Sequence, residues 1–521
     1  MERREKFVNK NRKKRNLHTF LAIFLVVLLL PGCSMPDWLK GTDNQLKTTS
    51  KTEQTFDYEV PSSSPSILVN QLGYYTDSVK TAIFIGEDVP DTFSVIDVDT
   101  KEEVFTGQIE HKGFQEDNTY ISTGTFTNLT KSGEYYILCD TIGQSYHFEI
   151  SDMAYDTLLN DMLKEISDNR WKNYHTESQE TVIIDEEKGT TIETSGGWYT
   201  TIYDTKKVRE VKSGSKTLVN LLLSAELYME EHSDATGIDE SSNEIPDILD
   251  EGAYEALWLL KMQDSKTGAV YSSLTEQGEE LILGEQSIEA CQHFIIAMAK
   301  FSYSMKSYDS AFATECLRAS DAAWKYVESI RTSQKEEHKE MQTQIDESLR
   351  FFGATELFRA SGAYRYHTVI KEYVPTMSDE NLWTREEYLG AFTYLGTRLA
   401  VSKSLCEELM RQVMDLGETI AGESKENGML AIGTGENENC QDLLWKMTIM
   451  TSIDYIIGNH EYDTILENNL HYMLGRNEKS YSYIEGYGND EPIKKANLSV
   501  CDDLEQTSAL IFMLSEIISN R

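Results

Sequence analysis

The pattern of apolar and polar residues divides the chain into four parts. Residues 19–30 form an apolar run directly after a basic segment, whereas residues 34–66 are polar and show no period. Over residues 67–150, short apolar or alternating runs are separated by Gly, Asp and Asn, which predicts a small β-sandwich. From residue 151 to 521 the apolar positions recur at helical spacing, so this part is expected to be all-α.

The helical part predicts about a dozen amphipathic helices. Leu249, Ala253, Ala256, Leu257 and Leu260 lie on one face of a helix. Such a series suits a toroid of paired helices. An α-solenoid is the alternative, but its typical repeat of about 30–50 residues is not found in the sequence. Comparable stripes occur at residues 218–229, 288–303, 312–327, 349–360, 388–400, 405–420, 443–457, 464–474 and 509–518.

The first 33 residues predict export. A basic segment precedes the apolar run of residues 19–30, which is short for a membrane-spanning helix. The run ends in Leu-Pro-Gly-Cys33, which resembles the bacterial lipobox, where the Cys becomes a lipidated N-terminus. We therefore expect a signal peptide over residues 1–33, a polar linker over residues 34–66, and a protein that a lipid on Cys33 anchors to the outer face of the bacterial membrane. An uncut signal anchor is the alternative.

Composition narrows the range of partners. The formal net charge of −39 argues against a nucleic-acid partner, because phosphates need Lys and Arg for neutralisation.

The six cysteines other than Cys33 are scattered without a C-x-x-C pattern, so most are expected to be small buried residues. The histidines show no zinc-site spacing. We expect a monomer with no cofactor, and calcium bound by carbonyl and carboxylate oxygens cannot be recognised in the sequence.

The loop that starts at Ser195 has the composition of a saccharide-cleft wall. Gly196 and Gly197 permit a sharp turn, and Trp198 and Tyr199 follow directly. These aromatic side chains stack well on flat apolar faces, including those of sugar rings. A well-packed turn is the alternative interpretation.

This loop and several later stretches resemble glycoside hydrolase family 9, the inverting cellulases with an (α/α)6 barrel. The resemblance implies an Ig-like β-sandwich at residues 67–150, an (α/α)6 barrel at residues 151–521, and a β-1,4-glucan polysaccharide or oligosaccharide as substrate. The matching stretches are Val69–Tyr74 of the Ig-like module, Ile245–Glu251, Trp258–Gln263, Ala354–Gly362, Leu474–Asn477 and Tyr481–Gly488.

The departures from the family pattern fall on its catalytic positions. The family's two aspartates align with Thr200 and Tyr203, and its catalytic acid aligns with Cys501. The family's His-His-Arg segment aligns with Pro492–Asn497, which holds neither His nor Arg. Whether the chain is an enzyme is therefore left open by the sequence.

Inverting hydrolysis requires two carboxyl groups about 6.5–9.5 Å apart. Asp204 is the candidate base, and Asp502 or Asp503 is the candidate acid, although each of them also suits an exposed or helix-capping position. Three functions remain open: a glucanase with relocated acids, a binding protein with a saccharide groove, and a surface scaffold with a closed cleft. We expect weak or absent hydrolysis. The candidate sugar-stacking residues are Trp198, Tyr199, Tyr203, Tyr483 and Tyr487.

The last predicted strand ends near Ile150 and the helical pattern begins by Tyr155. With almost no linker between them, the sandwich is expected to pack on the helical part.

Overall fold

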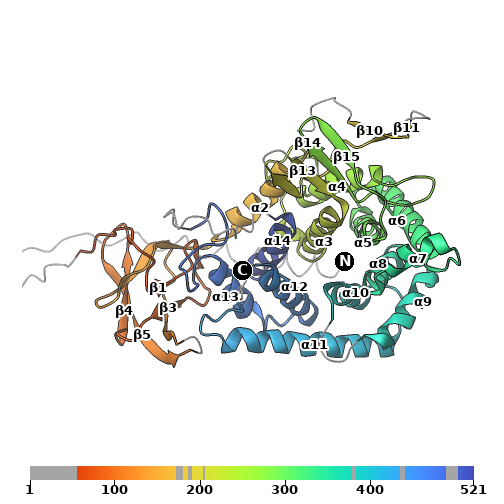
Figure 1. Cartoon of the computed structure of the whole chain (residues 1–521). Coiled ribbons are helices and arrows are strands. Elements are labelled where there is room, and N and C mark those ends of the chain that lie inside the picture. Colours follow the sequence, from red (N-terminus) through yellow and green to blue (C-terminus); the bar gives the residue numbers. More distant parts are fainter. Residues whose placement is uncertain are drawn as a thin grey trace, which may run out of the picture. The chain divides into compact units, whose positions relative to one another are not determined.

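The computed structural model describes residues 55–115, 118–171, 180–185, 190–203, 206–377, 383–433, 440–488 and 503–521. The part from Gln54 to Arg521 forms one compact unit in which strands come first and helices follow (Figure 1). Cys33, the rest of the predicted signal peptide and the first part of the predicted linker lie outside the described residues. Within the described ranges, none of the helices combines the length and the apolar character that crossing a bilayer requires.

The N-terminal domain is built from nine strands around its own apolar core. Hydrogen bonds connect them in the order β1-β3-β6-β5-β4-β7-β9-β2, with β8 paired to β7. The long strand β5 pairs with β4 through its first half and with β6 through its second half. The predicted β layers therefore form one continuous curled sheet. The strands are β1 (Ile67–Leu68), β2 (Gly73–Tyr75), β3 (Thr81–Ile85), β4 (Thr92–Asp97), β5 (Glu103–Phe114), β6 (Tyr120–Thr125), β7 (Gly133–Cys139), β8 (Gly143–Gln144) and β9 (Phe148–Ser151).

The C-terminal domain is mainly helical, with long helices that alternate between an inner and an outer position (Figure 1). These are α2 (Asp156–Asp168), α3 (Val211–Leu227), α4 (Asp247–Lys261), α5 (Ile288–Met305), α6 (Ser310–Arg331), α7 (Lys339–Thr343), α8 (Glu347–Ser361), α9 (Tyr364–Tyr373), α10 (Arg385–Leu395), α11 (Lys403–Glu426), α12 (Cys440–Ile457), α13 (Asp463–Met473) and α14 (Leu504–Ser519).

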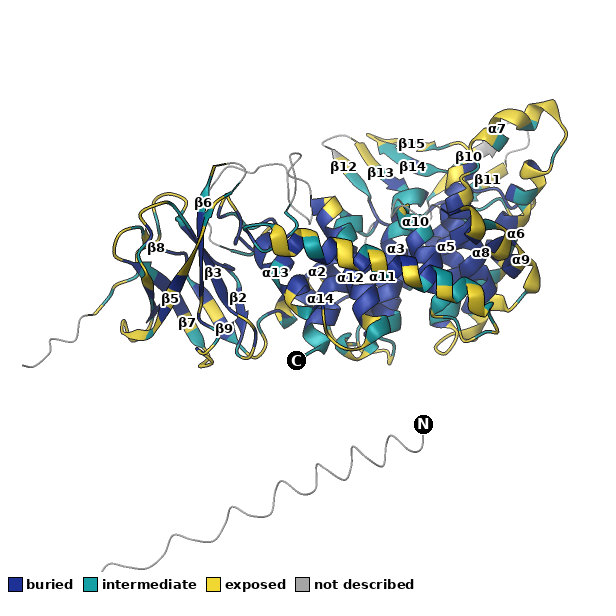
Figure 2. Ribbon diagram, turned by 90° about the horizontal axis from the view of Figure 1, so that it is seen from below, coloured by how far each residue is buried: buried dark blue, intermediate teal, exposed yellow. Residues whose placement is uncertain are grey.

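Six helices close into an inner ring. Helices α3, α5, α8, α10, α12 and α14 contact one another in this order, and α14 returns to α3. Helices α2, α4, α6, α9, α11 and α13 pack outside, as expected for an (α/α)6 barrel. Figure 2 shows the difference in burial: α3 and α5 are mainly buried, whereas exposed residues recur along α11. Because inner and outer helices alternate along the chain, all inner helices run in one direction and their N-termini share one end of the ring.

The helical domain also contains strands, which corrects the expectation of an all-α domain. Strands β12 (Thr201–Tyr203), β13 (Lys206–Glu210), β14 (Ser273–Gln277) and β15 (Glu280–Leu283) form a four-stranded antiparallel sheet. Strands β10 (Thr181–Asp185) and β11 (Thr190–Glu193) form a separate hairpin. The apolar pattern did not reveal them, because the segments are short and none of them has a long alternation of apolar and polar residues.

The two domains pack on each other, as the short connection predicts. The backbone N–H of Gln71 in the sandwich donates to the Leu474 carbonyl at 2.9 Å, and its side-chain Nε2 donates to the Ser480 carbonyl at 2.9 Å. Arg476 is fully buried and donates to the Thr81 carbonyl at 3.4 Å. The stretches that resemble the family at residues 69–74 and 474–477 thus meet at the domain interface.

Candidate functional site

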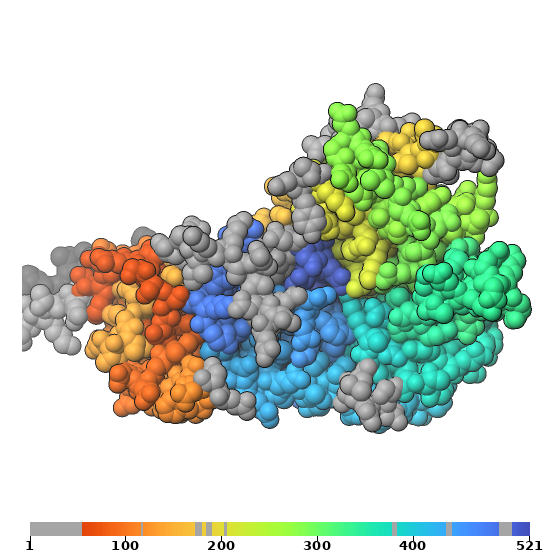
Figure 3. Space-filling model, in the orientation of Figure 1, coloured from red at the N-terminus to blue at the C-terminus, as the bar shows by residue number. Residues whose placement is uncertain are grey.

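A pocket of about 410 Å³ opens where the N-terminal ends of the inner helices meet, and we call it the mouth pocket. In Figure 3 the yellow surface near the start of α3 and the dark blue surface of α14 lie side by side, although these segments are far apart in sequence. The residues lining the pocket are Lys216, Asn220, Arg385, Glu386, Gln441, Asp442, Leu444, Trp445, Thr448, Glu505, Gln506 and Ala509.

Two cations hold the carboxylate of Glu505 in this pocket. Lys216 Nζ lies 3.4 Å from Glu505 Oε1, and the Arg385 guanidinium donates to the same oxygen. Arg385 Nη2 also donates to Asn220 Oδ1 at 2.8 Å. Burial and the neighbouring Arg385 charge lower the pKa of Lys216. Because both cations are held by its carboxyl oxygen, Glu505 is poorly placed to donate a proton to a substrate in general acid catalysis.

Trp445 gives the mouth pocket an aromatic wall. Its partly buried ring meets the Tyr388 ring edge-on at 5.6 Å between centroids, and the Arg385 guanidinium carbon lies 5.8 Å from the Trp445 ring centroid. Asn220 and Gln441 add amide groups to the same lining. An aromatic face together with a few amides and charges is the type of lining that binds sugar rings and their hydroxyls.

The loop with the two glycines is a packed turn. Trp198 is fully buried; its Nε1 donates to Glu251 at 2.6 Å and its backbone N–H donates to Glu255 at 2.9 Å. Gly197 has a φ of 81°, and a Cβ on it would lie 2.5 Å from the Trp258 ring. The structure therefore corrects the expected role of Trp198, because a ring without exposed surface offers no face to a sugar.

The two buried glutamates that hold this loop come from one face of α4. Arg170 donates to both carboxyl oxygens of Glu251, at 3.0 and 2.9 Å, and also to Glu240. Burial raises the pKa of Glu251, and it raises the pKa of Glu255 to about 8. The sequence analysis missed this role. Glutamates four residues apart on an otherwise buried helix face were the available signal.

The two residues after Trp198 also form hydrogen bonds within the protein. Tyr199 is 8% exposed, its hydroxyl donates to Glu276 at 2.8 Å, and Lys207 Nζ lies 4.8 Å from its ring centroid. Thr200, which the sequence analysis aligned with the first aspartate of the family pattern, donates its hydroxyl to the Val208 carbonyl at 3.2 Å. The hydroxyl of this residue therefore already has a backbone partner.

The two candidate tyrosines near the end of the chain differ in exposure. Tyr483 is 2% exposed and stacks on Tyr472 with 6.1 Å between ring centroids, so the structure places it in the core. Tyr487 is partly exposed, and its hydroxyl donates to Asp161. Of these two residues, only Tyr487 keeps surface that a ligand can reach.

Asp503 is the N-cap of α14. Its Oδ1 accepts the Glu505 backbone N–H at 2.9 Å, and its Oδ2 accepts from Gln506 Nε2 at 2.9 Å. This is the capping role that the sequence left open beside a catalytic one.

Several other predicted site residues lie outside the described residues. These are Asp204, Cys501, Asp502, the segment Pro492–Asn497 and the side chain of Tyr203.

Two groups of side chains in the described part of the chain have the arrangement of cation ligands. Asp234, Asp247 and Asp250 provide oxygen atoms only, which suits Ca²⁺ or Mg²⁺. Asp234 of this group already accepts hydrogen bonds from the protein, because the backbone N–H groups of Ser242 and Glu244 donate to it at 2.6 and 2.8 Å. The second group contains a histidine and comprises Asp454, His460 and Asp463.

The cysteines agree with the sequence analysis as far as they are described. Cys139, Cys291, Cys316 and Cys440 are buried, Cys406 is partly buried, and all five are free thiols.

Comparison with known families gives two matches that together cover most of the chain. The model of glycosyl hydrolase family 9 matches residues 160–497. The model of the cellulase N-terminal Ig-like domain matches residues 62–144.

Comparison with individual proteins gives similar relatives. A cellodextrinase of Butyrivibrio fibrisolvens is 26% identical over 503 residues, covering 84% of this chain and 88% of the relative. A xyloglucan-specific endo-β-1,4-glucanase of Bacteroides ovatus is 25% identical over 508 residues and covers 84% of both chains.

Solved structures share the fold. A metagenome-derived family 9 endoglucanase superimposes with a TM-score of 0.73 at 20% identity, over 87% of this chain and 99% of the other. A thermostable endoglucanase of Alicyclobacillus acidocaldarius gives a TM-score of 0.70 at 18% identity, over 87% and 99% of the two chains.

Proposed function

Because the chain belongs to glycosyl hydrolase family 9, we propose that its mouth pocket binds β-1,4-glucan oligosaccharides and that hydrolysis there is weak or absent. Similar proteins are named as a cellodextrinase and an endo-β-1,4-glucanase, which supports this class of ligand. The partly buried ring of Trp445 and the exposed side chain of Gln441 provide groups that such a ligand needs.

The hydrogen bond of Thr200, which we align with a catalytic aspartate of the family, is the observation that carries the proposal of weak hydrolysis. Its hydroxyl is bonded to the Val208 carbonyl and supplies no base for the attacking water. Glu505 lies in the mouth pocket, but Lys216 and Arg385 neutralise its charge. Losing general acid or base catalysis costs about 10²–10⁴ in rate per group. Losing the group that orients the water adds to this cost.

Titration calorimetry with cellohexaose tests the binding half of the proposal. The unsubstituted chain is expected to bind, and Trp445→Ala is expected to weaken binding about tenfold, because aromatic stacking contributes about 0.5–1.5 kcal/mol beyond buried area. Tyr364→Ala is the control, since Tyr364 is 66% exposed on outer helix α9. Equal affinity of the Trp445→Ala and unsubstituted chains would place the ligand elsewhere.

A glucanase with relocated carboxyl groups is the second candidate function. Its support is the similarity to proteins named as hydrolases over most of the chain. In this case Asp204 serves as the base, and Asp502 or Asp503 serves as the acid. Hydrolysis that both Asp204→Ala and Asp502→Ala abolish would establish this function. The scaffold hypothesis requires a closed cleft, and the mouth pocket argues against it.

We also propose that the protein is exported and anchored by a lipid on Cys33. The basic segment, the apolar run and Leu-Pro-Gly-Cys support this proposal. Cys33→Ala is expected to abolish incorporation of labelled fatty acid and partitioning into membranes. Labelling that persists in this variant would refute lipidation at Cys33.

A further inference from the structure

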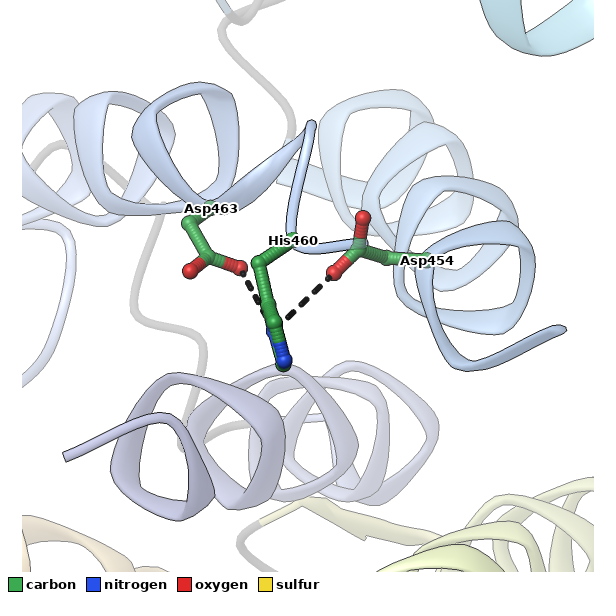
Figure 4. A group of neighbouring side chains, drawn as sticks. All are labelled: Asp454, His460 and Asp463. Carbon is green, nitrogen blue, oxygen red and sulfur yellow. Dashed lines mark ion pairs between the residues drawn. The ribbon is translucent and has the colours of Figure 1, made fainter. Parts of the chain in front are cut away.

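A histidine and two aspartates converge where α12 turns into α13 (Figure 4). Asp454 lies near the end of α12, His460 lies in the turn, and Asp463 is the first residue of α13. His460 Nδ1 is 3.8 Å from Asp454 Oδ2 and 3.7 Å from Asp463 Oδ1. Figure 4 shows the imidazole between the two carboxyl groups.

Glu516 of α14 brings a third carboxyl group to this cluster. Its side chain is 2% exposed and contacts the Asp454 carboxyl group. One of its oxygens, Oε2, is buried without a hydrogen-bond partner. A buried acceptor without a partner is costly, and it is an independent sign that something else belongs beside it.

The charges around the cluster do not balance. Two carboxyl groups face a single imidazole, a third carboxyl group, that of Glu516, contacts Asp454, and the side chain of Asp454 is 1% exposed. Arg521 also acts on Asp463 electrostatically, but its guanidinium pairs with Glu467 and Asp77. Buried carboxylates are found paired with cations or bound to metals, because an uncompensated buried charge is expensive.

We propose that Asp454, His460, Asp463 and Glu516 bind one divalent transition-metal ion of the Zn²⁺ or Mn²⁺ type. Ligand atoms around a tetrahedral ion with bonds of about 2.1 Å are about 3.4 Å apart. The observed separations of 3.7 and 3.8 Å therefore need only a small contraction. An imidazole among the ligands favours these metals over Ca²⁺, which prefers oxygen ligands alone.

The proposed metal site is separate from the mouth pocket and lies at the opposite end of the barrel. Asp454 lies nine residues after Trp445 on α12, which corresponds to about 14 Å along the helix. The bound ion ties the α12–α13 turn to the C-terminal part of α14. Its function is therefore to stabilise the barrel, and it takes no part in sugar binding.

Metal titration of the full-length chain, stripped with a chelator, tests the proposal. Zn²⁺, Mn²⁺ and Ca²⁺ are added separately, and binding is followed by calorimetry and by thermal unfolding. Zn²⁺ or Mn²⁺ is expected to raise Tm by a few degrees, because a ligand that binds only the native state stabilises it. His460→Ala is expected to weaken this binding at least tenfold. His338→Ala is the matched control, since His338 lies beside a single carboxylate, at 3.8 Å from Glu337.

A second variant separates metal binding from folding. Glu516→Gln keeps the shape of the side chain and removes its charge, so the metal-free variant is expected to fold with an unchanged or higher Tm. Its metal-induced rise in Tm is expected to be lost. The proposal is overturned if only Ca²⁺ binds, if no ion binds, or if both variants bind Zn²⁺ and Mn²⁺ as tightly as the unsubstituted chain.

Discussion

Glu255 holds the loop at Trp198 through a hydrogen bond to its backbone. The same glutamate is expected to make the unfolding free energy of the protein depend on pH. Its carboxyl group is fully buried on α4 and accepts the Trp198 backbone N–H. Burial raises its pKa to about 8, from an ordinary value near 4.5. The native state therefore binds a proton more readily than the unfolded chain does. The stabilisation is complete below the unfolded-state pKa and is lost as pH rises through about 8.

Glu255→Gln is expected to remove this dependence. Glutamine remains neutral and still presents an oxygen to the Trp198 N–H. The unfolding free energy of the unsubstituted chain should therefore fall relative to that of Glu255→Gln as pH rises from 5.5 to 8.5, with a limiting slope of about 1.4 kcal/mol per pH unit. Urea unfolding at three pH values measures the difference. A difference that does not change with pH would show that Glu255 is ionised in the native state throughout this range.

Single residues also show where sequence reasoning failed. The Gly-Gly-Trp-Tyr loop was predicted to line a saccharide cleft, but its composition is equally compatible with a sugar platform and with a packed turn. The choice depends on Glu251 and Glu255, more than fifty residues later in the chain. Similarly, Lys216 and Glu505 meet in the mouth pocket across 289 positions, and nothing in either local sequence indicates the other.

At the scale of elements, apolar periodicity predicted helices well and charged strands poorly. The face formed by Leu249, Ala256 and Leu260 did predict α4, because an amphipathic helix carries its own signal. Strand β13 reads Lys-Lys-Val-Arg-Glu and is formed by pairing with β12 and β14. Because such pairing depends on the adjacent strands of the sheet, the sequence of a five-residue segment alone does not reveal it.

The start of α14 allows the two roles of Asp503 to be separated. As an N-cap, Asp503 should contribute about 0.5–2 kcal/mol to stability, so Asp503→Ala is expected to lower the unfolding free energy by this amount. Asp503→Asn should retain most of it, because asparagine also caps well. Urea unfolding of both variants checks the expectation. If Asp503 is instead a catalytic acid, both variants lose hydrolysis while their stabilities differ.

At the scale of the whole molecule, the two domains are joined by close contacts. Gly475 has a φ of 108°, and a Cβ on it would lie 2.3 Å from Gln71 Nε2. Tyr74 of the sandwich meets His471 of α13 with 4.8 Å between ring centroids. The resemblance to family 9 did predict both domains and their order, but the contacts that join them became visible only in the structure.

Gly475→Ala is expected to disturb this interface. Backbone strain at a positive φ costs about 1–3 kcal/mol, and the clash with Gln71 adds to it. Gly362→Ala is a matched control, because Gly362 has a φ of 71° and has no neighbour within 4 Å of the added Cβ. Thermal unfolding and small-angle scattering should show a larger loss of stability and of compactness for Gly475→Ala. Equal effects of the two substitutions would mean that the contact with Gln71 is unimportant.

The most direct measurement is product formation from cellohexaose and xyloglucan by the chain without its first 33 residues, over a prolonged incubation. The account predicts binding of the oligosaccharide with little or no release of reducing ends. This prediction follows from the proposed alignment of Thr200, whose hydroxyl is bound to the Val208 carbonyl, with a family aspartate, and from the ion pair between Arg385 and Glu505. Rapid release of reducing ends that Asp204→Ala and Asp502→Ala each remove would contradict it.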